Sequence, residues 1–335
     1  MNATFVLQKE ILEELYVRED EFKSFLSFLK SHFRDYTLIT DFVDESDFIS
    51  SAEENPLLEL LVDKFTNIEY ISDLASYFED EKFKTLFSQR TIVLSAVNDE
   101  ICNEYLNAKG VLFFNLGLLK NWEIYSDIIL SKSLKVTKDS SIPRDLRFVD
   151  FQDLCRFFKY CNSLIIFDRY VFGDKSNQKL VHNLYILIEN ILTVIPNAEL
   201  MIISEFKGDE IVKNYNLLNN HLKSKGLLGY SLKLIHHSKA FYPRKFEGLH
   251  SRFILSNYIH IISHDSFNFF KEDGSFNNLT DIDIKFNLTN QNNYSYVKDL
   301  ATVKTYLSKI KNEPNCGNPE LKVTYCKDKF SALIA

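Results

Sequence analysis

Residues 163–204 decide the fold of this chain, with the sequence SLIIFDRYVFGDKSNQKLVHNLYILIENILTVIPNAELMIIS. Two apolar runs, at residues 163–167 and 200–204, have the length and composition of buried strands. Between them, apolar residues recur every three to four positions over residues 177–192, which predicts an amphipathic helix. A strand, a helix and a second strand in this order favour a parallel pair of strands with the helix packed against it.

The same alternation continues towards the C-terminus. A helix is predicted over residues 209–224, and a closing helix over residues 297–311. Three further apolar runs predict strands at residues 231–235, 251–255 and 258–262. The stretch 273–293 is polar and dense in Asn and Asp. Beyond Glu313 the chain is expected to be loosely held.

The N-terminal half shows a similar rhythm. Helices are predicted at residues 9–33, 56–65, 74–87 and 99–108, and strands at residues 36–40, 68–71, 91–95 and 111–115. Residues 131–146 are rich in Ser, Lys, Asp and Thr, and we expect a connection or an exposed loop there. The predicted fold class is therefore α/β, with two α/β modules at residues 1–145 and 146–335.

Composition excludes several classes of function. The nine glycines form no GxxxxGK[ST] and no GxGxxG motif, which argues against a P-loop or a dinucleotide-binding fold. The five cysteines are odd in number and no two are spaced CxxC, so we expect reduced thiols, no zinc site and no cofactor. Charged residues interrupt the N-terminal segment, and no apolar run is long enough to span a membrane. These features predict a cytoplasmic protein with no membrane partner.

The most specific motif lies at the strand predicted over residues 251–255. His250 and Arg252 are two residues apart, so strand alternation places both side chains on one face. Asn257 follows five residues after Arg252, and a polar segment with Ser266 and Asn268 follows the next predicted strand.

This motif resembles that of the phospholipase D-like superfamily, H-x-K-x4-D followed by a polar segment. The resemblance covers roughly residues 160–310 and includes Asp168-Arg169-Tyr170 at the end of an earlier strand. It implies a mixed sheet flanked by helices, with His250 as the nucleophile on a phosphodiester and Arg252 as the cation that binds phosphate. Asn257 stands at the acidic position, and Ser266 and Asn268 in the polar segment.

This chain departs from the family pattern at two positions, with Arg252 in place of Lys and Asn257 in place of Asp. An arginine binds phosphate through a bidentate fork, whereas an asparagine cannot act as a carboxylate. Active members use two facing motifs, and only one is found here. The site is therefore either completed by a homodimer or binds its ligand without cutting it.

A basic loop precedes the motif and adds candidates for nucleic-acid binding. Lys239, Arg244 and Lys245 alternate with Phe241, Tyr242 and Phe246, a mixture suited to a single-stranded or flipped nucleic acid. Asp168 and Arg169 end a predicted strand, where ligands collect in open α/β sheets. The net charge of −7 requires any such site to be a local basic patch.

Three functions follow from these patterns. The first is a protein that recognises a phosphodiester of DNA or RNA, with a nuclease activity that uses His250, in a bacterial antiviral defence system. The second is a non-catalytic scaffold that holds a partner protein in such a complex. The third is a metal-dependent nuclease that uses N-terminal carboxylates, namely Asp41, Asp44, Asp47, Glu45, Glu53 and Glu54.

Overall fold

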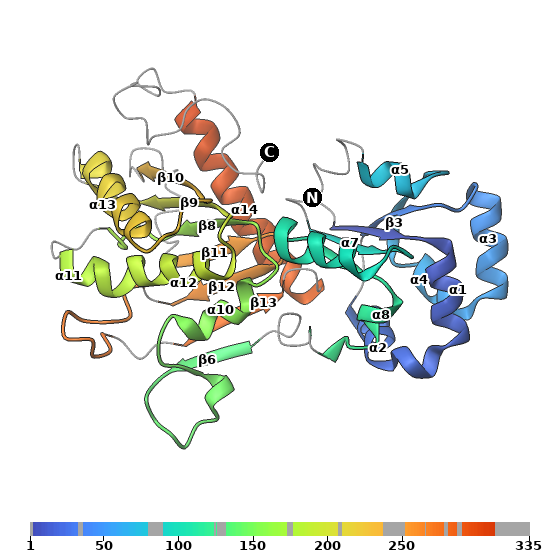
Figure 1. The fold of residues 1–335 in the computed structure, drawn as a ribbon, viewed down its shortest axis with the longest axis horizontal. Helices are drawn as coiled ribbons and strands as arrows, with labels where there is room; N and C mark the ends of the chain where they lie inside the picture. The colour runs from blue at the N-terminus through green and yellow to red at the C-terminus, as the bar shows by residue number, and fades with distance from the viewer. Residues whose placement is uncertain are drawn as a thin grey trace. The chain divides into compact units, whose positions relative to one another are not determined.

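The chain divides into two compact units in the computed structural model (Figure 1). The N-terminal unit comprises residues 1–129 with 287–294, and the C-terminal unit comprises residues 130–286 with 295–335. The structure describes residues 3–32, 36–79, 90–123, 125, 132–172, 177–206, 210–236, 252–264, 266–277, 281–286 and 290–311. One unit is built on a parallel sheet and the other on a mixed sheet, so the fold class is α/β, as predicted.

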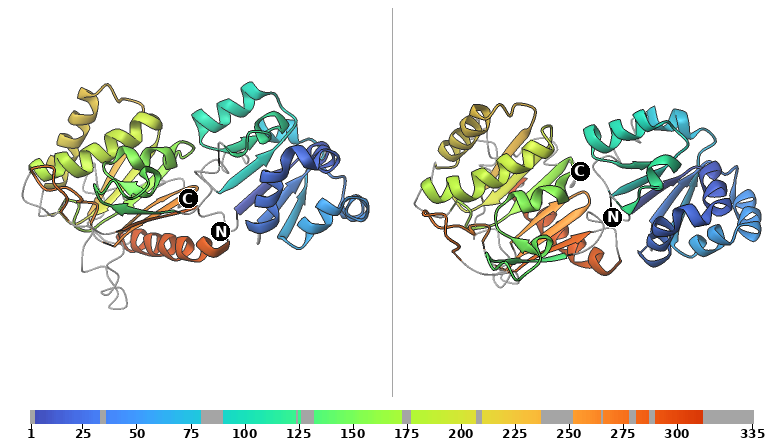
Figure 2. Two further views of the ribbon diagram at one scale, coloured as in Figure 1. Left: turned by 90° about the horizontal axis from the view of Figure 1, so that it is seen from below. Right: turned by 60° about the horizontal axis from the view of Figure 1, so that its bottom comes forward.

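The N-terminal unit contains a five-stranded parallel sheet in the order β3-β2-β1-β4-β5. Its strands are β1 (Ala3–Leu7), β2 (Tyr36–Thr40), β3 (Phe65–Tyr70), β4 (Thr91–Leu94) and β5 (Leu112–Phe114). Its helices are α1 (Lys9–Val17), α2 (Lys23–His32), α3 (Glu45–Glu54), α4 (Pro56–Val62), α5 (Leu74–Glu79), α7 (Asp99–Glu104) and α8 (Leu116–Leu119). Helices lie on both faces of this sheet (Figure 2).

The central strand of this sheet, β1, was not predicted from the sequence. All five of its residues are buried, but the charged start of α1 follows it directly. The helix predicted over residues 9–33 is also divided, because the chain forms a 3₁₀ turn at Glu19–Phe22 between α1 and α2. The helix predicted over residues 74–87 is seen as α5, and residues 80–89 lie outside the described part.

The C-terminal unit contains an eight-stranded mixed sheet in the order β10-β9-β8-β11-β12-β13-β6-β7. Strands β8 (Ser163–Phe167), β9 (Glu199–Ser204) and β10 (Ser231–His236) are parallel. Strands β11 (Arg252–Ser256), β12 (Ile259–Ser263) and β13 (Ile282–Phe286) continue the sheet in antiparallel pairs, followed by β6 (Lys132–Val136) and β7 (Arg147–Phe148). Strands β8 and β9, which lie within residues 163–204, are therefore a parallel pair, as predicted.

Helices cover both faces of the mixed sheet. They are α10 (Gln152–Phe158), α11 (Asn177–Leu180), α12 (Ile186–Val194), α13 (Glu210–Ser224) and α14 (Asn290–Lys311). Phe167 and Phe253 stack with 4.9 Å between ring centroids and form a core with Tyr296 and Leu300 of α14. The other face is covered by α10, α12 and α13, which lie opposite α14 in Figure 2. Helix α14 begins before its predicted start at residue 297.

Two strands lie in polar stretches of the sequence. The connection predicted over residues 131–146 is wrong for residues 132–136, because β6 pairs with β13 there. Only Leu134 and Val136 of this strand are buried, and they alternate with exposed polar residues. The sequence therefore has no continuous apolar run there. Strand β13, in the polar stretch 273–293, was not predicted for the same reason. The observed division at residues 129 and 130 consequently precedes the predicted boundary at residue 145.

None of the described helices combines the length and the apolar character that a membrane span requires.

The described cysteines provide a test of how the two cores are packed. Burial raises the pKa of the Cys102 and Cys161 thiols to about 12 and that of Cys155 to about 11. Because the thiolate is the reactive form, we expect iodoacetamide to alkylate these cysteines at least about a hundredfold more slowly in the native protein than in urea at pH 8. Peptide mass mapping measures this ratio. Equal rates in the two states would contradict the packing.

Candidate functional site

A group of polar side chains lies where β8 ends and β11 begins. Phe167 of β8 pairs with Phe253 of β11, so the next position of the register sets Asp168 opposite Arg252. Arg252 in turn pairs with Ser263 of β12. Strand alternation therefore places these three side chains on one face of the sheet, the face opposite α14.

The Asp168 carboxylate is fully buried and organises this end of the sheet. Its Oδ1 accepts a hydrogen bond from the backbone N–H of Tyr170 at 2.9 Å. Its Oδ2 accepts the hydroxyl of Ser266 and the backbone N–H of Phe267, both at 2.7 Å. Asp168 thus fastens the segment after β12 to the end of β8, and its role in substrate binding stays a prediction.

Two opposing effects act on the Asp168 carboxyl group. Burial raises its pKa, because a carboxylate without water around it is disfavoured. The hydrogen bonds from Ser266, Tyr170 and Phe267, and the nearby charge of Arg252, lower that pKa without reversing the effect of burial. Arg252 is therefore close enough to interact electrostatically with a buried acid.

The half-buried Arg252 side chain is held in two directions. Its Nη1 donates to the backbone carbonyl of His264 at 3.0 Å. Its guanidinium carbon lies 5.3 Å from the centroid of the Tyr170 ring, within the range of a cation–π contact. The guanidinium of Arg169 lies at the same distance from that ring, and Arg169 Nε donates to Glu205 Oε2 at 2.6 Å. Both arginines thus contact the Tyr170 ring, and Arg169 also pairs with Glu205.

Asn268 completes the group on the segment after β12. Its side-chain Nδ2 donates to the carbonyl of Tyr170 at 3.2 Å. Its Oδ1 is buried and has no hydrogen-bond partner within the described part of the chain, and the same holds for the hydroxyl of Ser263. Buried polar atoms without partners are uncommon and mark places where a ligand or water binds. We call Asp168, Tyr170, Arg252, Ser266 and Asn268 the Arg252 cluster.

The structure brings together five of the residues that the sequence singled out: Asp168, Arg169, Arg252, Ser266 and Asn268. It does not bring Asn257 to them. Asn257 is buried in the turn after β11, where its Oδ1 accepts the backbone N–H of Asn162 at 3.3 Å. Five residues of extended strand correspond to roughly 16 Å, so Asn257 lies at the opposite end of β11 from Arg252.

The other predicted site residues lie outside the described residues: His250, Lys239, Arg244 and Lys245. Two members of the site were not assigned to it from the sequence. Ser263 is found only through the register of β11 and β12. Tyr170 belongs to the Asp-Arg-Tyr segment, but no sequence pattern indicates that its ring is exposed.

Three of the N-terminal acids singled out in the sequence, Asp41, Asp44 and Asp47, have structural partners. Asp41 Oδ1 accepts the backbone N–H of Lys9 at the start of α1, at 2.6 Å. The Lys9 ammonium pairs with Asp47 Oδ1 at 3.0 Å, and Asp44 caps α3 by accepting the N–H of Asp47. Hydrogen bonds from the Val43 N–H and from Lys9 lower the pKa of Asp47. Within the described residues, no three His, Cys, Asp or Glu side chains form a group that could hold a metal ion. These contacts favour capping roles for the acids.

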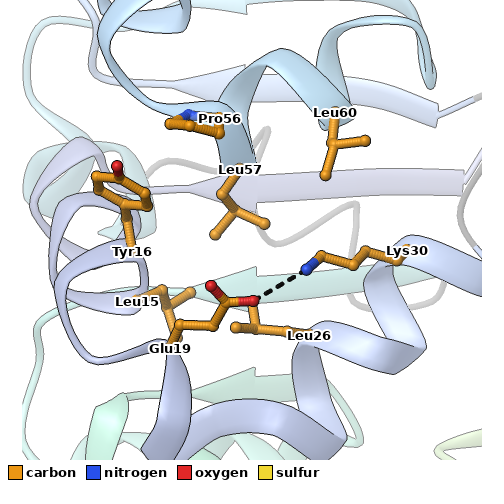
Figure 3. Close-up of a pocket in the computed structure, with 8 residues that line it drawn as sticks. All are labelled: Leu15, Tyr16, Glu19, Leu26, Lys30, Pro56, Leu57 and Leu60. Atoms are coloured by element: carbon orange, nitrogen blue, oxygen red, sulfur yellow. Dashed lines mark hydrogen bonds and ion pairs between the residues drawn. The ribbon is translucent and has the colours of Figure 1, made fainter.

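A small pocket in the N-terminal unit lies between α1, α2 and α4 (Figure 3). Its walls include Leu15, Leu26 and Leu57, and the ion pair of Lys30 with Glu19, at 3.1 Å, crosses one side. Its volume of about 60 Å³ is well below that of an ordinary ligand site. A nucleotide does not fit in it.

No protein-family model matches the chain, and no curated protein matches it either.

Proposed function

We propose that the C-terminal unit binds a phosphodiester group of nucleic acid at the Arg252 cluster. The resemblance to phospholipase D-like proteins assigns the role of phosphate-binding cation to Arg252. A guanidinium suits that role because its planar fork of donors matches the oxygens of a phosphate.

One observation carries the proposal. Asp168, Arg252, Ser266 and Asn268 come from three separate stretches of the sequence, and they converge at the carboxyl end of β8. Ligands of open α/β sheets bind at the carboxyl ends of strands. The buried Asn268 Oδ1 and the Ser263 hydroxyl, which have no partner in the described residues, add polar groups for a ligand to meet.

The negative net charge of the protein means that nucleic acid can be attracted only by a local group of positive side chains. The net charge is −7, so the molecule as a whole repels a polyanion. Asp41 and Asp47 already hold the start of α1 and the Lys9 ammonium in the N-terminal unit. Arg252 contacts the backbone carbonyl of His264 and the Tyr170 ring, and its guanidinium supplies positive charge at this end of the sheet.

The test is direct binding of labelled single-stranded and duplex DNA and RNA at low and high salt. We expect binding that weakens steeply with salt, because phosphate contacts release counterions. We also expect it to persist in EDTA, because the site uses an arginine and no metal carboxylates. Cleavage that survives EDTA but disappears in His250→Ala would add the nuclease activity. Absence of binding to every polyanion at low salt would overturn the proposal and favour a scaffold.

A further inference from the structure

Tyr170 is unusually exposed for an aromatic residue of this protein. The chain has 29 Phe and 17 Tyr. Among those whose burial the structure describes, only Tyr16, at 42%, and Tyr170, at 39%, are strongly exposed. A ring left in water forgoes the burial that stabilises the others. Tyr16 borders the small pocket of the N-terminal unit, whereas Tyr170 lies beside Arg252.

The backbone of Tyr170 is held on both sides of its side chain. The Tyr170 N–H is bound by Asp168, and its carbonyl accepts the side chain of Asn268. The backbone that carries the ring is therefore held in place next to Arg252, the residue that binds the phosphate in the proposed function. Arg169 also contacts the ring, but Glu205 balances its charge at 2.6 Å. The arrangement combines an exposed aromatic ring with the guanidinium of Arg252, whose carbon lies 5.3 Å from the ring centroid.

We propose that Tyr170 stacks on an unpaired base of the same strand whose phosphate Arg252 binds, so that the ligand is single-stranded nucleic acid. This inference rests on the proposed function of the Arg252 cluster. The bases of a duplex are stacked on one another and do not reach a side chain beside the backbone, whereas a single strand turns its bases outward. A phosphate that draws the Arg252 guanidinium towards itself also uncovers the ring for the base.

The test compares ligands that have the same backbone but differ in their bases. The wild-type protein is titrated with a labelled oligothymidylate, with the same oligomer made abasic throughout, and with a duplex. We expect the base-bearing single strand to bind about tenfold more tightly than the abasic strand, as one stacked base provides. A matched oligouridylate shows whether the strand is DNA or RNA.

Variants locate the effect on the ring. In Tyr170→Leu the preference for bases over the abasic strand is expected to disappear, whereas Tyr170→Phe keeps it because the ring remains. Tyr16→Leu is the control, because it removes another exposed aromatic side chain among the described residues, and it should bind like the wild type. Thermal unfolding of each variant verifies the fold, and the comparison of ligands on the wild-type protein needs no variant.

The outcomes separate this inference from the proposal beneath it. If the wild type binds the abasic strand as tightly as the base-bearing strand, and Arg252→Gln weakens both, the phosphate site stands and the stacking role of Tyr170 is overturned. Equal binding by Tyr170→Leu and the wild type overturns that role as well. If no oligomer binds at low salt, the phosphate site itself fails.

Discussion

Replacing Arg252 by glutamine is expected to weaken nucleic-acid binding by roughly ten- to a hundredfold, the loss of one charge-assisted contact to phosphate. Glutamine keeps much of the length of the side chain but removes the charge and the fork of donors. The slope of log Kd against log salt should also become shallower by about one counterion. Fluorescence anisotropy of a labelled single strand over a series of salt concentrations measures both quantities.

Two further variants separate the effect of the bidentate guanidinium geometry from the effect of the positive charge. Arg252→Lys keeps the charge and loses the bidentate geometry, so its affinity is expected to fall between those of the wild type and Arg252→Gln. Arg18→Gln changes the net charge equally, on an arginine that pairs with Glu14 and Glu21 in the N-terminal unit. If Arg18→Gln weakens binding as much as Arg252→Gln does, only the overall charge matters and the site is not at Arg252.

Replacing Asp168 by alanine is expected to destabilise the C-terminal unit by about 3 kcal/mol. The substitution leaves the Ser266 hydroxyl and the N–H groups of Tyr170 and Phe267 without their acceptor, and removes a buried acid that interacts electrostatically with Arg252. Circular dichroism during urea unfolding follows this loss. The only tryptophan, Trp122, belongs to the other unit, so its fluorescence follows that unit separately.

The control for this effect is an exposed acid in the same unit. Asp139 accepts the N–H of Ser141 at 2.9 Å, and Asp139→Ala should change the free energy of unfolding by no more than about 0.5 kcal/mol. A loss in Asp168→Ala as small as that in Asp139→Ala would contradict the role of Asp168 as the residue that fastens the two segments.

The same carboxyl group gives stability a dependence on pH. Burial raises its pKa in the folded state above the ordinary value of 3.8, so the folded protein holds this proton more tightly than the unfolded chain. The contribution is fully present below pH 3.8 and is lost as the pH rises through the folded-state pKa. We therefore expect the unfolding free energy of the wild type, relative to Asp168→Asn, to increase as the pH falls from neutral. A constant difference would contradict this.

The sequence predicted much of the fold because the buried strands β8 and β9 are continuous apolar runs. It predicted the Arg252 cluster in part for the same reason: Asp168 and Arg252 border such runs, so their places at strand ends follow from the pattern. Strand β1 was missed because the charged start of α1 follows it directly, and β6 and β13 were missed because they alternate charged with apolar residues. Such runs are strands only because a neighbouring strand pairs with them.

Asn257 shows that spacing in a linear motif differs from distance in the folded chain. In the sequence it stands five residues from Arg252, and a motif treats that spacing as proximity. In an extended strand the same spacing separates the two side chains by the length of β11, and Asn257 closes a turn at the far end. Ser266 and Asn268 are more distant in sequence, but the reversal from β11 to β12 returns them to Arg252.

The sequence itself determined the α/β class, the strands of residues 163–204 and the place of Arg252 at the start of a strand. Apolar periodicity and a charged residue at a strand end are local properties. The tertiary structure alone decided that Asp168 is buried as the acceptor for the segment after β12, and that Tyr170 remains exposed beside Arg252. Burial and exposure depend on which distant segments pack together, and a local pattern carries no record of those partners.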